Sequence, residues 1–239
     1  MRWLVVLMMI ACGAAPAKAQ EPQGLVVVEL FTSQGCNSCP PADEFLAELA
    51  NRPDVLALGL HVDYWDYIGW KDPFAQRAHT ERQRSYSRSL HQRYIYTPQM
   101  VVNGAYQHVG SDRDAIGKLI DKARKEASAG PALHVAGTGL QRSLHIGPAS
   151  IDRPTTVWLV GFDRQRNTLI KAGENSGRRI ANHNVVREML SVGTWKGGTV
   201  DLPLDLAPLA ANCDAAAVLV QVDETGPIVA ATRIEPPLR

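Results

Sequence analysis

The sequence is poor in cysteine and in net charge: it has four cysteines in 239 residues and a formal net charge of +1. So few cysteines cannot form the disulfide framework of a small stapled domain, and the chain must bury a hydrophobic core instead. The balanced charge gives no electrostatic footprint for nucleic acid. With 45% apolar and 21% charged residues, the chain has a globular composition, and its length suits one large domain or two modest ones.

The sequence also lacks a hydrophobic run of the ~20 residues that a membrane-spanning helix needs. The apolar run at residues 3–11 is shorter, and it leads to an A-x-A cleavage site at residues 17–19. This pattern predicts a signal peptide over residues 1–19, a mature chain that begins at Gln20, and a periplasmic or secreted protein without a membrane span. The alternative is a lipobox that ends at Cys12, which would then be lipidated.

The first half of the chain predicts a β-α-β unit. Residues 25–31 form a near-continuous β-branched and apolar run, which is typical of a strand buried on both faces of a parallel sheet. Residues 40–50 read as a helix with two prolines in its first turn, and residues 55–62 read as a second buried strand. A crossover of this kind gives a parallel, right-handed pair of strands.

The next segments extend the order to β-α-β-α-β-β-α. Residues 72–94 are polar, rich in arginine and helical, and the arginines favour a solvated face over a binding patch. Residues 100–109 predict a hairpin around Asn103-Gly104, the preferred pair for a two-residue type I′ turn. A helix capped by Ser111 then runs to about residue 129.

Beyond residue 130 the pattern changes to short alternating segments separated by turn residues. The predicted strands are residues 132–136, 143–146, 156–160, 168–171, 185–192, 218–222 and 228–234. The fold class is therefore an α/β domain over residues 24–130 followed by an all-β, sandwich-like domain over residues 131–239.

Cys36 and Cys39 lie between the first strand and the first helix. Two cysteines at this spacing can close a disulfide, whose leading sulfur we expect to face solvent at the helix N-terminus, where a thiolate is stabilised. The alternatives are a purely structural disulfide and half of a zinc site, which would need two further ligands that no second motif supplies. Cys213 is expected to be a free, buried cysteine that packs like a small hydrophobe.

The element order, the C-x-x-C motif after the first strand and Thr97-Pro98 before the hairpin resemble the thioredoxin fold. This resemblance implies that Pro98 follows a cis peptide bond and, with Thr97, faces the cysteines. Several segments also resemble an exported bacterial family that is known only as a domain of unknown function with a thioredoxin-like fold. They are residues 28–36, 39–43, 61–66, 96–100, 173–175 and 183–187. The intervening pair Asn37-Ser38 is of neither the reducing nor the oxidising type, so the resemblance implies no direction of electron flow.

Glu29 is a carboxylate inside a strand that otherwise reads as buried. Buried acids have raised pKa values and can relay protons, so Glu29 is a candidate acceptor for the proton of Cys39. The alternatives are an ion pair with an arginine of residues 72–94, or a strand end that lies nearer solvent.

His61, Asp63, Tyr64 and Trp65 follow the second predicted strand, at the sheet edge where Cys36 also lies. With Trp70, the aromatic residues would offer apolar contact to a peptide substrate, and His61 and Asp63 would face the same way. The alternatives are an aromatic loop packed on the second domain and a metal role for His61 and Asp63. His183 and Arg187 are expected to have structural roles.

These observations predict thiol–disulfide exchange with other exported proteins. Cys36 would be the attacking thiolate and Cys39 the resolving thiol, and no organic cofactor or metal is needed. Two other classes stay open. One is a non-catalytic binding module with a static disulfide, and the other is a copper or redox-metal carrier that uses Cys36, Cys39 and His61 or Met100.

Overall fold

A computed structural model describes residues 24–126, 130–235 and 238. The predicted signal peptide, the alternative lipidation site at Cys12 and the predicted mature start at Gln20 lie outside the described residues. Within the described part of the chain, no helix combines the length and the hydropathy needed to cross a bilayer.

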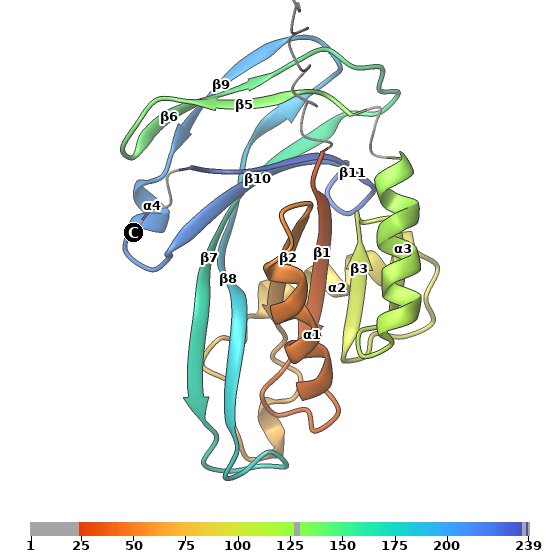
Figure 1. Ribbon diagram of the computed structural model, residues 1–239, viewed down its shortest axis with the longest axis vertical. Coiled ribbons are helices and arrows are strands. Elements are labelled where there is room, and N and C mark those ends of the chain that lie inside the picture. The colour runs from red at the N-terminus through yellow and green to blue at the C-terminus, as the bar shows by residue number, and fades with distance from the viewer. Residues whose placement is uncertain (1–23, 127–129, 236–237, 239) are drawn as a thin grey trace, which may run out of the picture.

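The elements of the first half are β1 (Val26–Thr32), α1 (Pro40–Ala50), β2 (Val55–His61), the 3-10 helix η1 (Asp66–Ile68), α2 (Arg77–Ser89), β3 (Gln99–Val102), β4 (Tyr106–Val109) and α3 (Arg113–Glu126). Those of the second half are β5 (Leu133–Ala136), β6 (Gln141–Ile146), β7 (Thr155–Leu169), β8 (Arg179–Trp195), β9 (Val200–Asp205), α4 (Ala207–Ala210), β10 (Ala215–Val222) and β11 (Ile228–Arg233). The molecule is a mixed α/β protein built on one large mixed sheet (Figure 1).

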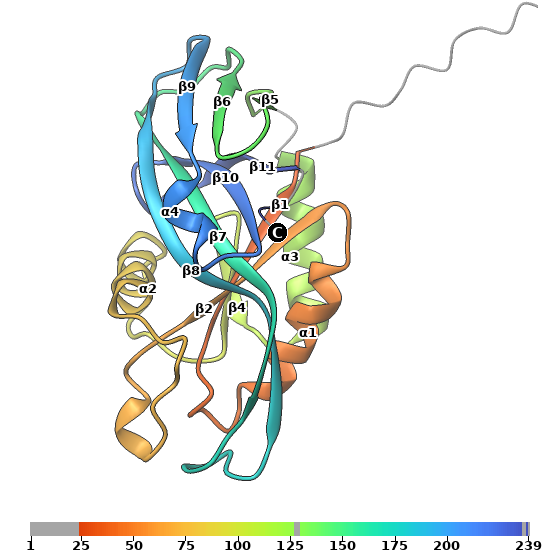
Figure 2. The ribbon, with the colours of Figure 1, turned by 90° about the vertical axis from the view of Figure 1, so that its left-hand side faces the viewer.

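This sheet has eight strands in the order β11-β10-β7-β8-β2-β1-β3-β4. β1 and β2 are parallel and fully buried, as predicted from their apolar sequences, and β1 pairs antiparallel with β3. Alternate residues of β1 face opposite sides because side chains alternate along a strand. Val26, Val28 and Leu30 pack with α1 and α3, while Val27 and Phe31 pack in the cluster that contains Tyr86 of α2. Helices therefore cover both faces of this part of the sheet (Figure 2).

The second half continues the same sheet across the boundary predicted near residue 130. β7 and β8 form a long antiparallel hairpin, and β8 also pairs with β2 at Gly59 and Val185. The predicted strand 156–160 and residues 168–169 of the predicted strand 168–171 belong to the single strand β7. The polar residues 163–167 between them concealed this continuity in the sequence.

A second sheet of three strands, in the order β5-β6-β9, covers part of the large one. Its buried residues Leu144, Ile146 and Leu204 share a cluster with Val157 of β7 and Val218 of β10. β9 was not predicted, because its proline and two aspartates obscure the strand pattern in the sequence. Cys213 is buried in this cluster with no disulfide partner among the described residues, as predicted, and its burial raises the pKa of the thiol to about 11.

Two local predictions concern the β3–β4 region. The Thr97–Pro98 peptide bond is cis, as expected. Asn103 and Gly104 have φ values of 45° and 62°, which a type I′ turn requires. The pairing of Val102 with Tyr106 nevertheless places three residues between the strands rather than the expected two.

Candidate functional site

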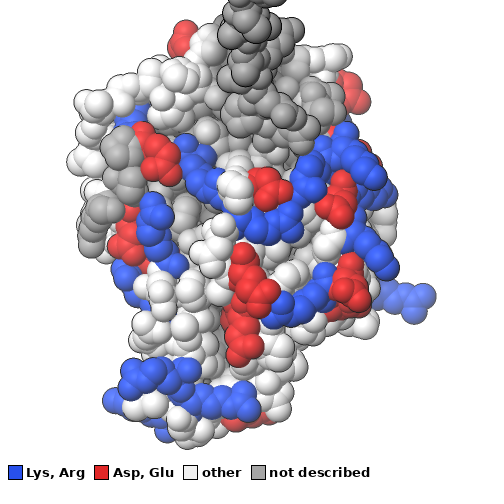
Figure 3. Space-filling model, in the orientation of Figure 1, with Lys and Arg blue, Asp and Glu red and all other residues white. Residues whose placement is uncertain are grey.

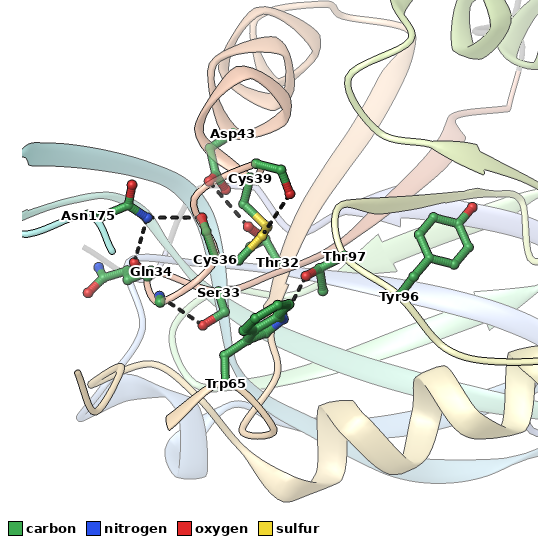
Figure 4. Close-up of a disulfide and its surroundings, with 12 residues drawn as sticks. Thr32, Ser33, Gln34, Cys36, Cys39, Asp43, Trp65, Tyr96, Thr97 and Asn175 are labelled. Atoms are coloured by element: carbon green, nitrogen blue, oxygen red, sulfur yellow. Dashed lines mark hydrogen bonds between the residues drawn. A yellow bond between two sulfur atoms is a disulfide. The ribbon is translucent and has the colours of Figure 1, made fainter. Parts of the chain in front are cut away.

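Cys36 and Cys39 form a disulfide at the end of β1 and the start of α1 (Figure 4). The Cα atoms are 5.5 Å apart and the χ3 angle is 86°. Cys39 is the N-cap of α1, and Pro40 and Pro41 occupy its first turn, where a missing backbone N–H costs no helical hydrogen bond. The prediction that this motif joins a buried strand to a helix is confirmed.

The expectation that the leading sulfur faces solvent is wrong, because Cys36 is only 1% exposed. Tertiary contacts cover the cysteine turn, residues 33–39 between β1 and α1, from two sides. Trp65 and Ile68 pack against Gly35, where an added Cβ would lie 3.3 Å from Trp65. On another side, the Asn175 side chain donates a hydrogen bond to the carbonyl of Cys36 at 2.9 Å. Asn37 and Ser38, between the cysteines, remain exposed.

A buried carboxylate, Asp43, follows Cys39 by one turn of α1 and was not singled out in the sequence. The backbone N–H of Asp43 donates to the carbonyl of Cys39, and helical side chains tilt toward the helix N-terminus, so the carboxylate leans toward Cys39. Its Oδ2 accepts a hydrogen bond from the Thr32 hydroxyl at 3.2 Å (Figure 4). Burial raises the pKa of Asp43 to about 7, against smaller opposing effects of His61 and Thr32.

His61 and Asp72 form a buried ion pair beside this acid. His61 Nδ1 lies 2.7 Å from Asp72 Oδ2, and Asp72 also accepts the backbone N–H groups of Gln34 and Phe74. Burial disfavours both charges, but the mutual attraction and hydrogen bonds prevail, so the pKa of His61 is raised and that of Asp72 is lowered. Since the charge of His61 also lowers the pKa of Asp43, the two acids and the histidine form one electrostatic unit.

The tip of the β7–β8 hairpin holds the cysteine turn in place, although it is about 140 residues away in sequence. Asn175 is buried and donates through Nδ2 to the carbonyls of Gln34 and Cys36, each at 2.9 Å. Asn182 of β8 accepts a hydrogen bond from Gln34 Nε2 at 2.9 Å. The segments 173–175 and 183–187, singled out by resemblance, thus lie at or next to this contact.

Among the residues expected to bind substrate, His61 is buried and its Nδ1 pairs with Asp72. Asp63 Oδ1 accepts the hydroxyl hydrogen of Thr80. Trp65 Nε1 donates to Thr97 Oγ1 at 2.7 Å, which joins the aromatic segment to the residue before Pro98 (Figure 4).

The remaining aromatic side chains of this segment are also engaged. Tyr64 donates to Gln83 of α2, and Trp70 Nε1 donates to Gln34 Oε1. These hydrogen-bond partners lie in the first half of the chain, whereas the alternative interpretation had the aromatic loop packed on the second domain. Arg187, for which a structural role was expected, lies over the ring of Phe74 at 5.3 Å and near Asp163.

Glu29 lies in a buried network away from the cysteine turn. Its Oε1 accepts from Arg82 Nε at 2.7 Å and its Oε2 accepts from the Tyr86 hydroxyl at 2.5 Å. Gln221 of β10 joins the network through Arg82 and Tyr86. The alternative considered for Glu29, an ion pair with an arginine of residues 72–94, is what the structure contains, and Asp43 is the buried acid next to the disulfide.

No group of three or more His, Cys, Asp or Glu side chains among residues 24–126 and 130–235 is arranged to hold a metal ion. His61 directs Nδ1 at Asp72, and Met100 is buried in the cluster between the sheet and α1.

A groove of about 790 Å³ lies next to the cysteine turn, between the start of α1 and the tip of the β7–β8 hairpin. Asn37, Pro40, Pro41, Asp43, Glu44 and Ala47 line one wall, and Arg178, Arg179, Ile180, Ala181 and His183 line the other. Asp43, although 5% exposed, thus borders a space open to solvent.

The profile of DUF1223, described as a protein of unknown function, matches residues 27–221. The chain belongs to the DUF1223 family. A crystal structure of an Agrobacterium tumefaciens protein, solved in a structural genomics programme, is similar to this DUF1223 protein with 33% identity and a TM-score of 0.78. The alignment covers 90% of this chain and 96% of that chain.

HBP35 of Porphyromonas gingivalis is similar in fold alone. It shares 14% identity with this DUF1223 protein at a TM-score of 0.60, over 89% of this chain and 75% of that chain. A search of proteins with curated descriptions gave no match.

Proposed function

We propose that this DUF1223 protein exchanges disulfides with protein thiols through Cys36 and Cys39. The observation that carries the proposal is the buried Asp43, with a pKa of about 7, one helical turn after Cys39. An ionised carboxylate that is buried in this way destabilises the folded protein. A static disulfide does not require a neighbouring base, so it does not explain why Asp43 is there. A dithiol that must lose a proton on the way to the disulfide does need a base there.

The reaction starts from the reduced protein. The Cys36 thiolate attacks one sulfur of a substrate disulfide, which forms the Cys36–substrate bond and releases the other substrate sulfur as a thiolate that takes up a proton. Cys39 then transfers its proton to the Asp43 carboxylate and attacks Cys36. The Cys36–Cys39 disulfide forms and the second substrate thiol leaves, so the substrate is reduced by two electrons and the protein is oxidised. Each step is reversible, and the reverse sequence oxidises a dithiol.

The element order β1-α1-β2-α2-β3-β4-α3 and the position of the C-x-x-C motif support a thioredoxin-like arrangement for residues 24–130. The N-terminal sequence supports export to the periplasm or beyond, where disulfides persist. Intact-mass measurement tests export: we expect a mature chain that begins at Gln20, and an acylated Cys12 at the N-terminus would show lipid anchoring instead.

The burial of the disulfide favours a second candidate, a binding module in which the bond is static. Cys36 is 1% and Cys39 0% exposed, and a substrate thiol must reach one of the two sulfurs. The burial of both sulfurs therefore supports a binding module, whereas the neighbouring Asp43 carboxylate supports exchange. The reduction potential of the disulfide distinguishes between the two functions.

The test is equilibration of the mature protein in dithiol redox buffers, with mass mapping of the Cys36–Cys39 pair. Cys213→Ser provides a background without the third thiol. Structural disulfides lie below about −300 mV, and we expect this one to lie above that value and to exchange with a small disulfide. A potential well below it, with no exchange, would establish the binding module.

A further inference from the structure

We infer that the outer edge of β8 at residues 179–183, called here the β8 edge, binds an extended, acidic segment of the substrate protein as an added strand. This inference rests on the proposed exchange function, for which it names the substrate surface. Four observations carry it: the direction of backbone groups, the missing strand partner, the adjoining groove and the local charge.

The register of the hairpin determines which backbone groups are available. Ile170 N donates to the carbonyl of Arg178 at 2.9 Å, and hydrogen-bonded pairs in an antiparallel ladder recur at every second residue. The pairs of Ile180 with Thr168 and of Asn182 with Arg166 are therefore the ones that bond to β7. The N–H and C=O groups of Arg179 and Ala181 point the other way.

The neighbouring residue agrees with this assignment. The carbonyl oxygen of His183 lies 3.1 Å from the position of a Cβ on Gly59, so it points away from β7 and toward β2. β2 pairs with β8 only at Gly59 and Val185, and no strand among the described residues pairs with the β8 edge beyond that point. An edge of this kind is a template for another strand.

The groove places this edge next to the chemistry. Arg179, Ala181 and His183 line one wall, while Asn37 and Pro40, which flank the cysteines, line the other. A strand added here would run beside the cysteine turn. A cysteine within or next to such a segment would then lie close to Asn37 and Pro40, the groove residues that follow Cys36 and Cys39 in sequence.

The charge of the hairpin tip indicates the kind of segment. Lys171, Arg178 and Arg179 are exposed around the tip, where the only exposed acid within residues 170–179 is Glu174. Figure 3 shows a basic patch at the hairpin end of the molecule. On the opposite wall, Glu44 is exposed. An acidic segment bound next to the hairpin tip would therefore form ion pairs with these cations. The cations would also steer its approach at low ionic strength.

The test measures binding of two labelled, cysteine-free peptides by fluorescence anisotropy, one rich in Glu and Thr and one with each Glu replaced by Lys. We expect only the acidic peptide to bind, with an affinity that falls as salt rises. Ala181→Pro removes the outward N–H without touching the ladder to β7, so it should weaken binding about tenfold or more, whereas Ala181→Val, which keeps the N–H, should not.

The charge variant Lys171→Glu/Arg179→Glu gives a second readout that does not depend on the fold tolerating proline. It should also weaken binding about tenfold, while the matched pair Arg88→Glu/Arg93→Glu on the α2 side should not. Equal binding of both peptides, or an acidic peptide insensitive to both edge variants, would overturn the inference.

A parallel assay of the wild-type protein with a small-molecule disulfide separates the two proposals. Exchange without peptide binding overturns the β8 edge alone. Peptide binding at the edge without exchange overturns the proposed function and the assignment of the segment to a substrate.

Discussion

Thr32 donates a hydrogen bond to Asp43 at 3.2 Å, and through it the end of β1 is joined to α1 directly behind the Cys36–Cys39 disulfide. Thr32 is also the residue that pairs with His61 across the β1–β2 ladder. Register partners in a ladder point to the same face of the sheet, so Thr32 and His61 lie on one face. This relationship places a titratable carboxyl group next to the thiol that, in the proposed exchange, gains or loses a proton.

Asp43→Asn should change the pH dependence of exchange. In the wild type, the base fraction of Asp43 rises as pH increases through about 7, and the rate at which Cys39 resolves a mixed disulfide should rise with it. The variant has no base, so the rate should fall at least about tenfold at neutral pH and rise only toward the ~8.5 of a free thiol. Stopped-flow measurement across pH tests this. Glu44→Gln, at the exposed neighbour, is the control, and a profile common to all three proteins would contradict the role.

The same variant should be more stable than the wild type at alkaline pH. The folded pKa of Asp43, about 7, lies above its unfolded value of 3.8, so the folded state binds the extra proton between these values. Stability from this group is therefore present at low pH and is lost as pH rises through 7. Asp43→Asn should gain about 2–4 kcal/mol at about pH 8 and little at about pH 4, as measured by urea unfolding.

Single cysteine variants should separate the two thiols. The proposed exchange requires reduction to expose Cys36, which is 1% exposed in the disulfide form and precedes the positive end of α1. In reduced Cys39→Ser its thiol should then alkylate faster than a free thiol of pKa ~8.5. In reduced Cys36→Ser, the thiol of Cys39 lies beside the Asp43 carboxylate and should label slowly at neutral pH. Iodoacetamide labelling with mass mapping, in the Cys213→Ser background, measures both. If the two thiols label equally slowly, the disulfide is static and the binding-module function replaces exchange.

Asp72→Asn should be strongly destabilising because it leaves His61 and two backbone N–H donors without their charged partner. A loss of about 3–5 kcal/mol is expected for one partner of a buried pair. The stabilisation by the His61–Asp72 pair is complete between pH 3.8 and pH 6.5, the unfolded pKa values of Asp72 and His61. It is lost as pH falls through the lowered pKa of Asp72 or rises through the raised pKa of His61.

The exposed pair His145–Asp201 provides the matched control for this variant. Asp201→Asn should change the unfolding free energy by at most about 1 kcal/mol, because surface ion pairs contribute little. Equal effects of Asp72→Asn and Asp201→Asn on the unfolding free energy would show that the buried pair stabilises the fold no more than a surface pair does.

Glu29→Gln should reduce stability without shifting the pH midpoint of exchange. Arg82 would lose its charged acceptor, at a cost of about 3–5 kcal/mol, whereas the proposed acceptor of the Cys39 proton is Asp43. Glu81→Gln, which breaks only exposed pairs with Arg77 and Arg84, is the control for stability. A shifted exchange midpoint in Glu29→Gln would return the proton-acceptor role to Glu29.

The candidate site was predictable where its signal is local in sequence. Cys36, Cys39 and the helix from Pro40 to Ala50 follow from spacing, proline positions and apolar periodicity. The burial of Asp43 was not predicted, because an acid in the first turn of a helix ordinarily faces solvent and complements the helix dipole. The packing of α1 against β1, β2 and β8 buries it.

The two buried strands, the helix after the cysteines and the positive φ values of Asn103 and Gly104 follow from local sequence, because each depends on residues within about ten positions. The tertiary structure decided which partners the buried charges take: Arg82 for Glu29, Asp72 for His61 and Thr32 for Asp43. It also decided that the β7–β8 hairpin extends the sheet of the first half and that Asn175 holds the cysteine turn. These contacts join residues far apart in sequence, and a buried polar group selects its partner by proximity in the folded chain rather than by a local pattern.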